Sequence, residues 1–189
     1  MKPFQHKPRH CSQCNTLFAP LRAMQDVCSP RCAVRKVKAA KAQDKVKLKA
    51  RKEAIKTIPQ LIKEAQIEFN GYVRSRDKDQ LCICCGKELG QGGVGGGFDA
   101  GHFRSVGSAA HLRFNENNCH GQRKYCNRYG AGRAVDYRIG LIRRIGIESV
   151  EALETDNHVH KWTREELIQI KEIYRAKRKD LEKRGINEA

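Results

Sequence analysis

The sequence has little of what a large hydrophobic core or a membrane span requires. Only 39% of its 189 residues are hydrophobic and 6% are aromatic, with a single tryptophan. No segment approaches the about 18 consecutive apolar residues of a transmembrane helix. The N-terminal stretch MKPFQHKPRHCSQC also lacks the apolar segment of a secretory signal peptide. These absences predict a cytoplasmic protein with a modest core and no membrane partner.

Acidic residues are scarce as well. The chain has 21 Asp and Glu against 38 Lys and Arg, which gives a formal net charge of +17 at pH 7. Such an excess is typical of a protein with a polyanionic partner, because each phosphate that Lys or Arg neutralises releases condensed counterions. An anionic membrane surface is the weaker alternative, since no basic amphipathic helix with a broad apolar face is evident. We therefore expect a nucleic-acid partner.

Cysteine, by contrast, is abundant. Cytoplasmic thiols stay reduced, so the nine cysteines are candidate metal ligands rather than disulfides, and their odd number agrees with this. The first four have the spacing C-x2-C-x13-C-x3-C, which is close to that of a tetrahedral zinc site. A structural zinc at Cys11, Cys14, Cys28 and Cys32 would fold residues 1–32, which have little core material of their own.

A second segment, residues 33–56, carries ten Lys or Arg residues against two acidic ones. Its Ala, Lys and Leu content favours a helix, although apolar positions are sparse. The segment is predicted to be a solvated basic arm that becomes ordered on DNA, with a solubilising linker as the equal alternative. The lysines expected to contact DNA are Lys36, Lys38, Lys45, Lys47 and Lys49.

The third segment, residues 57–189, contains two clear helix starts. Thr57 with Gln60, and Thr163 with Glu166, have the spacing of a capping box, and apolar residues follow both at helical intervals. The C-terminal helix could pack on the core or pair with a second copy of the chain. A further helix is expected to carry its apolar face on Val135, Ile139, Ile142 and Ile145, with Gly146 as its stop.

The central part of this segment, residues 81–146, contains a second cysteine knuckle. Cys82 and Cys85 form one C-x2-C pair and Cys126 is half of another, but the other half is Arg123. A guanidinium stays protonated and has no lone pair for zinc. We predict that Cys119 supplies the fourth ligand of a second structural zinc, since thiolate is the preferred zinc ligand, with His120 as the alternative. The intervening glycine run, residues 90–97, is predicted to be a flexible hairpin connection.

Polar residues suited to phosphodiester hydrolysis follow the knuckle. His102 is the best general base, because a neutral imidazole is available near pH 7. Asp99 offers a carboxylate nearby, and hard cations such as Mg²⁺ prefer oxygen ligands. The basic residues that flank them, and that we expect to contact phosphates, are Arg104, Arg123, Lys124 and Arg128.

Several stretches together resemble one family. FDAGHFRS, LRFNENN, CNRY, YRIGLIRRIG and HKWTREEL are similar to stretches of NinG, also called Rap, a family of phage recombination proteins, and the similarity covers most of the chain. It implies a structure-selective endonuclease with an HNH, or ββα-metal, core that cleaves branched DNA such as Holliday junctions and D-loops. It also implies catalytic Mg²⁺ or Mn²⁺, a location in the host-cell cytoplasm, and other recombination proteins as partners. Because junction cleavage needs two symmetric incisions, a homodimer would suit it.

The same resemblance assigns roles to individual residues. Asn127 occupies the place of the final metal ligand of the HNH motif, and Asn118 that of the asparagine which orients the base. Asp99 would share the catalytic cation with Asn127, although the motif places its acidic or histidine ligand directly before the base, where this chain has Gly101. His120 stays open between a second catalytic-metal ligand, a phosphate contact and a zinc ligand.

The predicted fold class is therefore α+β and mostly helical, with a small zinc-clamped ββα-metal core between flanking helices and an N-terminal zinc ribbon or knuckle. The predicted activity is that of a magnesium-dependent endodeoxyribonuclease of the Holliday-junction resolvase type. One alternative is a non-catalytic zinc-ribbon protein that binds nucleic acid as an accessory factor. The other, an RNA-binding zinc ribbon of the ribosomal kind, would leave the series Asp99, His102, Asn118 and Asn127 unexplained.

Overall fold

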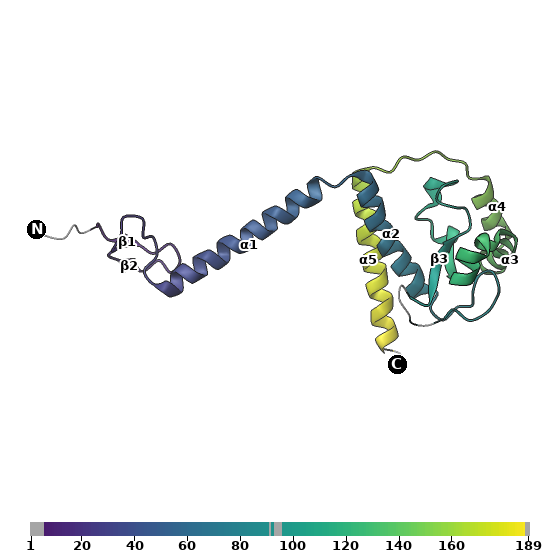
Figure 1. Ribbon diagram of the computed structural model, residues 1–189, viewed down its shortest axis with the longest axis horizontal. Helices are drawn as coiled ribbons and strands as arrows, with labels where there is room; N and C mark the ends of the chain where they lie inside the picture. The colour runs from purple at the N-terminus through teal and green to yellow at the C-terminus, as the bar shows by residue number, and fades with distance from the viewer. Residues whose placement is uncertain (1–5, 91, 93–95, 188–189) are drawn as a thin grey trace, which may run out of the picture. The chain divides into compact units, whose positions relative to one another are not determined.

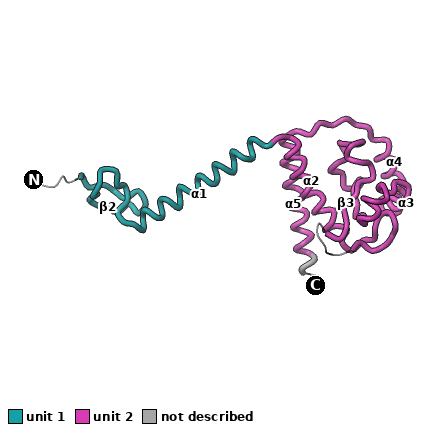
Figure 2. The backbone as a smooth tube through the Cα atoms, in the orientation of Figure 1, with its two compact units in different colours: residues 1–56 teal, residues 57–189 magenta. Residues whose placement is uncertain are grey.

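The computed structural model describes residues 6–90, 92 and 96–187. Part of the glycine run, and with it part of the predicted hairpin connection, lies outside these residues. The chain divides into two compact units, residues 1–56 and residues 57–189 (Figure 2). Both are built from helices and short two-stranded sheets, so the chain is mostly helical α+β, as the sequence predicts (Figure 1). Among the described helices, none has the length and apolar character to cross a membrane.

The first unit consists of a small cysteine-rich knuckle followed by one helix. β1 (Arg9–His10) pairs antiparallel with β2 (Leu17–Phe18). Helix α1 (Pro30–Ala54) begins where the Ser29 hydroxyl accepts a hydrogen bond from the backbone N–H of Cys32, and proline in its first turn suits this start. Within α1, Cys32 is buried and almost every later residue is exposed, so the helix predicted for the basic arm is present and solvated.

The second unit is organised around two long helices, α2 (Ile58–Arg76) and α5 (Arg164–Asn187), which pack side by side (Figure 1). Both predicted capping boxes are present, since the backbone N–H of Thr57 donates to Gln60 and that of Thr163 to Glu166, each at 2.8 Å. Ion pairs join the helices, Lys171 to Glu64 at 2.8 Å among them. Their shared core contains Leu61, Ala65, Phe69, Tyr72, Val73, Leu167 and Tyr174. The C-terminal helix thus packs on the core of its own chain.

A two-stranded sheet lies against α2. β3 (Phe98–His102) pairs antiparallel with β4 (Cys119–Arg123), with Phe98 opposite Arg123 and His102 opposite Cys119. A π-helical turn, Tyr125–Tyr129, follows β4 directly. Two helices, α3 (Ala134–Ile145) and α4 (Ile147–Thr155), complete the unit.

The prediction of which residues form the apolar face of α3 is partly wrong. Val135 is 74% exposed and Ile139 46% exposed, whereas Tyr137 and Leu141 are buried. Tyr137 is drawn inward because its hydroxyl donates to the backbone oxygen of Gly101 at 2.8 Å. Gly146 does end the helix, at a φ of 81° that favours glycine.

Candidate functional site

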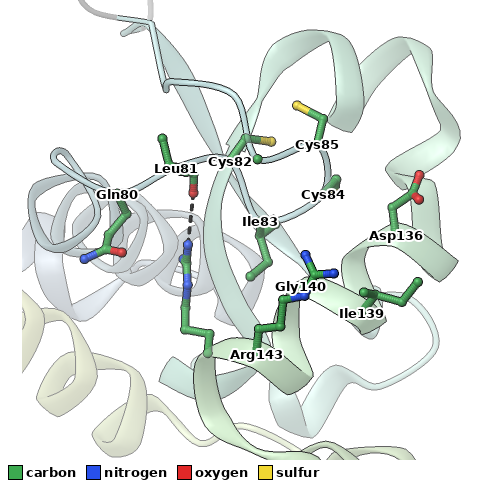
Figure 3. A pocket seen from close by; sticks show the side chains of 12 residues that line it. Gln80, Leu81, Cys82, Ile83, Cys84, Cys85, Asp136, Ile139, Gly140 and Arg143 are labelled. Atoms are coloured by element: carbon green, nitrogen blue, oxygen red, sulfur yellow. Dashed lines mark hydrogen bonds between the residues drawn. The ribbon is translucent and has the colours of Figure 1, made fainter.

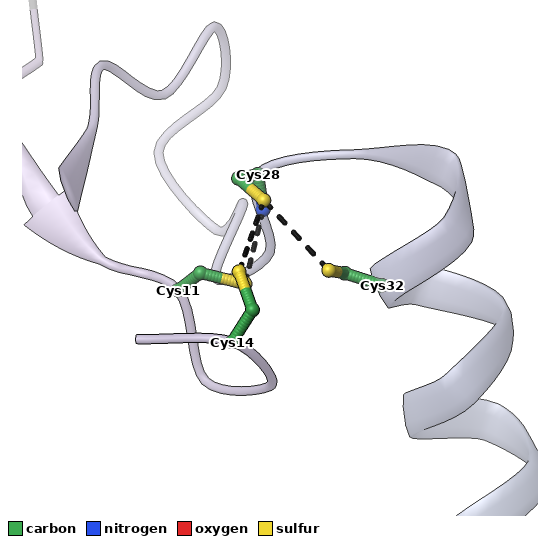
Figure 4. A group of neighbouring side chains, drawn as sticks. All are labelled: Cys11, Cys14, Cys28 and Cys32. Carbon is green, nitrogen blue, oxygen red and sulfur yellow. Dashed lines mark hydrogen bonds between the residues drawn. The ribbon is translucent and has the colours of Figure 1, made fainter. Parts of the chain in front are cut away.

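The N-terminal cysteines form one compact cluster. The sulfurs of all four, Cys11, Cys14, Cys28 and Cys32, lie within 4.8 Å of one another (Figure 4). The sulfurs of Cys14 and Cys28 are 3.5 Å apart, and those of Cys28 and Cys32 3.7 Å apart. The knuckle supplies Cys11 and Cys14, the segment just before α1 supplies Cys28, and the first turn of α1 supplies Cys32. Four convergent thiols suit tetrahedral zinc, so the residues of the predicted N-terminal site fit this metal.

Three cysteines form a second cluster in the core unit. The sulfurs of Cys82, Cys85 and Cys126 lie within 4.8 Å of one another. Cys82 and Cys85 stand on a tight loop above α3, and Figure 3 shows their sulfurs on the same side of it. The loop turns at Gly86, where φ is 64° and a residue with a side chain would be strained. The cluster therefore clamps this loop to the π-helical turn, and its three thiols could hold zinc.

Cys119 is not the fourth member of that cluster, and this prediction is wrong. Cys119 is the first residue of β4, whereas Cys126 of the three-cysteine cluster lies on the turn that follows the last residue of that strand. Its side chain is fully buried against α2 and α5, with Phe69 and Leu167 in the same hydrophobic cluster. Burial raises the pKa of the Cys119 thiol far above its usual range, which keeps the sulfur protonated. Cys119 is a core residue.

Asp99 and Asn127 come together beside the three-cysteine cluster. The Asn127 amide nitrogen donates to a carboxylate oxygen of Asp99 at 3.1 Å. Arg128 binds the same carboxylate through two hydrogen bonds of 2.8 and 2.9 Å. Burial raises the pKa of Asp99, but the hydrogen bonds from Arg128 and Asn127 outweigh it and hold the pKa below its ordinary value. The carboxylate is therefore ionised at neutral pH.

His102 and Asn127 line a common cavity of about 390 Å³, together with Gly101, Phe103 and Tyr137. The His102 Nε2 lies 2.9 Å from the backbone oxygen of Arg113, to which only an N–H can donate. This contact fixes the tautomer and leaves the lone pair on Nδ1. Burial lowers the pKa of His102, so the ring is neutral near pH 7.

Asn118 holds the loop between β3 and β4 in place. It is fully buried, and its side-chain oxygen accepts from the backbone N–H of Arg104 at 2.8 Å. Its amide nitrogen donates to the backbone oxygens of Arg104 and Leu112 at 3.0 and 3.2 Å. Every polar group of the side chain thus bonds the loop that follows His102, and the side chain fixes that loop rather than facing the cavity.

Gly101 stands where the HNH pattern has a metal ligand, and the structure shows why no side chain fits there. A Cβ at this position would lie 2.0 Å from the side-chain oxygen of Gln122. The buried Gln122 donates from its amide nitrogen to the Cys84 sulfur and to the backbone oxygen of Gly132, each at 2.9 Å. Alternation along β3 puts Asp99 and Gly101 on the same side of the strand. Asp99 is therefore the nearest carboxylate that this face of β3 offers.

His120 and Arg104 were candidates for the site, but both side chains bind other protein groups in the structure, and the phosphate contact of Arg104 stays a prediction. His120 is only 4% exposed, with Nε2 3.1 Å from the backbone oxygen of Asn117 and Nδ1 3.1 Å from Arg76. Burial and the charge of Arg76 lower the pKa of His120 to about 4. Arg104 instead donates to backbone oxygens at the end of α4, including that of Leu153 at 2.9 Å, because the last carbonyls of a helix have no partner within it.

The other predicted DNA contacts lie in varied surroundings. Arg128 binds Asp99, and Arg123 is half-buried at the end of β4. Lys36 forms an ion pair with Asp26. The other predicted lysines, Lys38, Lys45, Lys47 and Lys49, are exposed along α1. Basic residues thus lie next to the candidate site in the second unit and, separately, along α1 in the first.

Sequence reasoning missed a buried polar network and an exposed aromatic pair. Asp77, 3% exposed, accepts from Arg76 at 2.7 Å and from the backbone N–H of Gly121 at 2.7 Å, which ties α2 to β4. No local pattern signals such a contact. Tyr125 and Tyr129 are 65% and 80% exposed, with ring centroids 6.4 Å apart on the π-helical turn that carries Asn127. Their spacing of four residues around a polar segment was a signal that could have been read.

These features define a mostly helical α+β protein with two cysteine clusters that could bind zinc and a cavity lined by His102 and Asn127. The family model for the bacteriophage lambda NinG protein matches residues 3–184, so the chain belongs to the NinG family. It is 39% identical to the ninG proteins of Salmonella phage P22 and Escherichia phage lambda, over 92% of this chain and 93% of each relative. The ninG protein of Escherichia phage 933W is 38% identical over the same shares. No solved structure matches the chain.

Proposed function

We propose that this protein is a magnesium-dependent endonuclease that cleaves branched DNA recombination intermediates, such as Holliday junctions and D-loops, in the host cytoplasm. The observation that carries the proposal is the contact of Asp99 with Asn127, together with the cavity that Asn127 and His102 both line, on two strands and the turn that follows them. Strand, loop, strand and helical turn stand in the order of the ββα-metal core that the sequence suggests. The three cysteines hold the turn next to the strands.

His102 is the general base of this mechanism. Its Nε2–H is committed to the backbone oxygen of Arg113, so Nδ1 is the atom that can accept a proton from water. The protein contact of Nδ1 is the protonated Cys119 sulfur at 3.8 Å, and a thiol is only a weak donor. The lone pair thus has no strong donor on it, and the lowered pKa keeps it unprotonated at neutral pH. Because Cys119 is buried, the attacking water would have to reach Nδ1 from the side of the cavity that His102 lines.

Asp99 and Asn127 are the residues that would hold Mg²⁺. A carboxylate and an amide oxygen are ligands that this cation accepts, with substrate phosphate and water completing its shell. When bound, the cation stabilises negative charge on the phosphate and on the leaving oxygen. The Asn127 nitrogen points at Asp99, so its amide oxygen lies at the opposite end of the group. A turn of the amide by about 180° would bring that oxygen to the side of the carboxylate, where the two residues could bind one hard cation.

Arg128 acts as an exchangeable partner of Asp99. Its side chain is 56% exposed, whereas that of Asp99 is 15% exposed, so solvent or a phosphate can reach the guanidinium from outside. A DNA phosphate offers the same bidentate geometry as the carboxylate. Arrival of the substrate would therefore move Arg128 to the phosphate and release Asp99 to bind the cation.

Selectivity for branched DNA would come from the exposed tyrosines. Tyr125 and Tyr129 flank Asn127 on the same turn, with ring centroids 6.4 Å apart. The two rings are tilted by 37° to each other, so each exposed ring offers a separate face on which an unpaired base could stack. Bases at a branch point can leave the duplex stack, and stacking on aromatic side chains stabilises them.

Purified protein incubated with matched junction, D-loop, duplex and single-stranded DNA, with and without Mg²⁺, tests the proposal. We expect incisions near the branch point only when Mg²⁺ is present. Binding without cleavage across Mg²⁺ and Mn²⁺ concentrations would favour the second candidate, a non-catalytic accessory protein that binds DNA. Gly101 favours that candidate, because it stands where the HNH motif has a metal ligand and has no side chain to bind a metal. A size measurement on the junction complex would show whether two copies bind, as symmetric incisions require.

A further inference from the structure

The core cysteine cluster has three sulfurs where a closed zinc site has four. We infer that this cluster binds zinc through Cys82, Cys85 and Cys126 alone, and that the fourth coordination position takes an exchangeable ligand from solution. In the resting protein that ligand is water, and a small monodentate thiol is the chemical class that would replace it, because zinc with sulfur ligands favours a further sulfur. The inference concerns metal binding and does not depend on DNA cleavage.

The backbone around the cluster has the geometry of a complete knuckle pair. The N–H of Arg123 donates to the Cys82 sulfur at 3.3 Å, and the N–H of Cys82 donates to the backbone oxygen of Lys87 at 2.8 Å. Residue 123 stands three positions before Cys126, as Cys82 stands three before Cys85. The main chain thus brings residue 123 to the place of a fourth ligand, and only its side chain is unsuited to zinc.

No other residue in the described part of the chain completes the cluster. Among its His, Cys, Asp and Glu side chains, only Cys82, Cys85 and Cys126 gather there. Cys119 is four strand positions from residue 123, roughly 13 Å along β4 at about 3.3 Å per residue, and points into the core. Cys84 contacts the sulfur of Cys82, but it is not within 4.8 Å of all three sulfurs of the cluster, and its own sulfur accepts from the Gln122 amide nitrogen at 2.9 Å.

The charges at the site suit three thiolates. Zinc with three thiolates carries a net charge of −1, whereas four would give −2. The guanidinium of Arg133 is hydrogen-bonded to the Cys126 sulfur, which brings positive charge to the cluster. Arginine at position 123 removes a ligand and adds a further positive residue to the segment that supplies the third sulfur.

The two cysteine clusters should consequently differ in how firmly they hold zinc. The N-terminal cluster offers four sulfurs and closes the coordination shell, whereas the core cluster offers three. An open position gives a chelator or a thiol a direct path to the metal. The expected result is one zinc ion released quickly by a chelator and one released slowly, from the same full-length protein.

Zinc release to a chromogenic chelator, measured on the full chain, tests the inference. We expect two zinc ions per chain, of which one leaves at least about tenfold faster. In the Cys85→Ser variant the fast phase should be absent and the slow phase intact, which assigns the phases. Titration of the cobalt-substituted protein with 2-mercaptoethanol should change the spectrum of the core site and leave that of the N-terminal site unchanged.

Arg123→Cys supplies the missing sulfur and is the decisive variant. It should slow the fast phase to the rate of the N-terminal site and abolish the response to 2-mercaptoethanol. Lys124→Cys is the matched control, because it adds a thiol one position out of register and should leave the fast phase unchanged. One zinc ion in the unmodified protein, equal release rates for two, or an Arg123→Cys variant that behaves like its parent would each overturn the inference.

Discussion

Two histidines on neighbouring strands illustrate how much surroundings matter at the scale of the residue. His102 ends β3 beside the cavity, with Nε2 held by the Arg113 backbone oxygen. His120 lies in β4 opposite Gly101, buried with Asp77 and Arg76. Burial lowers the pKa of both rings, yet only His102 borders a space that a substrate could reach. The first is a candidate base and the second a structural residue.

Replacement of His102 by alanine should lower the rate of DNA cleavage by at least about 10²-fold, the contribution of a general base. DNA affinity should change little, because the ring is neutral and contributes no charge to phosphate binding. The pH profile of the unmodified protein should lose activity only below the ordinary histidine pKa of about 6.5, since the pKa of His102 is lowered.

The control for this variant is His158→Ala, since His158 is an exposed histidine. Circular dichroism and thermal melting should establish that the His102→Ala protein is folded, because the ring lies 6.1 Å from that of Phe69. Full cleavage activity in a folded His102→Ala protein would contradict the proposed mechanism.

His120 predicts a pH effect on stability rather than on cleavage. Its pKa is about 4 in the folded protein and about 6.5 in the unfolded chain. The stability that comes from the neutral ring is therefore present above pH 6.5 and is lost as the pH falls towards 4. Urea unfolding of His120→Asn should show a smaller loss of stability over this range, by on the order of 2 kcal/mol. A loss equal to that of the unmodified protein would mean that His120 does not titrate in this way.

At the scale of the element, the π-helical turn Tyr125–Tyr129 combines three functions in five residues. Cys126 points to the cysteine cluster, Asn127 to Asp99, and the two tyrosines to solvent. A π-helical turn has a wider ring of hydrogen bonds than an α-helix and often occurs at functional sites. Its position directly after β4 places Asn127 in the wall of the cavity.

The double variant Tyr125→Ala, Tyr129→Ala should reduce the preference for junctions over plain duplex. Each stacked base is worth about 1–3 kcal/mol, so the affinity for a junction should fall about tenfold or more, while duplex affinity stays nearly constant. Fluorescence of 2-aminopurine at the branch point should show quenching on binding of the unmodified protein and less quenching with the variant. Tyr125→Phe, Tyr129→Phe is the control and should behave like the parent, and equal losses on both DNAs would argue against stacking.

At the scale of the whole molecule, the proposed DNA attachment and the candidate chemistry belong to different units. The first unit has little apolar core and presents the lysines of α1 to solvent. The second contains the cavity and the three-cysteine cluster. The high net charge is thus divided between a helix that could bind phosphates over some length and residues such as Arg128 next to the site.

Neutralisation of Lys38, Lys45, Lys47 and Lys49 to glutamine should weaken DNA binding and flatten its dependence on salt. Each lost phosphate contact on duplex DNA should lower the slope of log affinity against log salt by about 0.9. The maximal cleavage rate on saturating DNA should stay the same, because these residues lie outside the second unit. An unchanged salt slope would identify α1 as a solubilising linker.

Sequence by itself determined the features that depend on residues close together in the chain. Helix starts at Thr57 and Thr163 follow from local capping geometry, and the helix through the basic arm follows from its composition. Cysteine spacing likewise indicated both clusters, because a knuckle is a local turn whose thiols converge wherever it folds. Family membership rested on the same kind of information.

Tertiary structure decided everything that depends on which face of an element is covered. The packing of β4 on α2 buries Cys119 and removes it from the zinc ligands, and the network around Asp77 withdraws His120 from the site. Arg104 is directed to the end of α4, which is 49 residues away in sequence. Such contacts join residues far apart in the chain, so the spacing of residue types carries no record of them. The same packing brought Asp99 to Asn127, because β3 and the π-helical turn meet only when the sheet has formed.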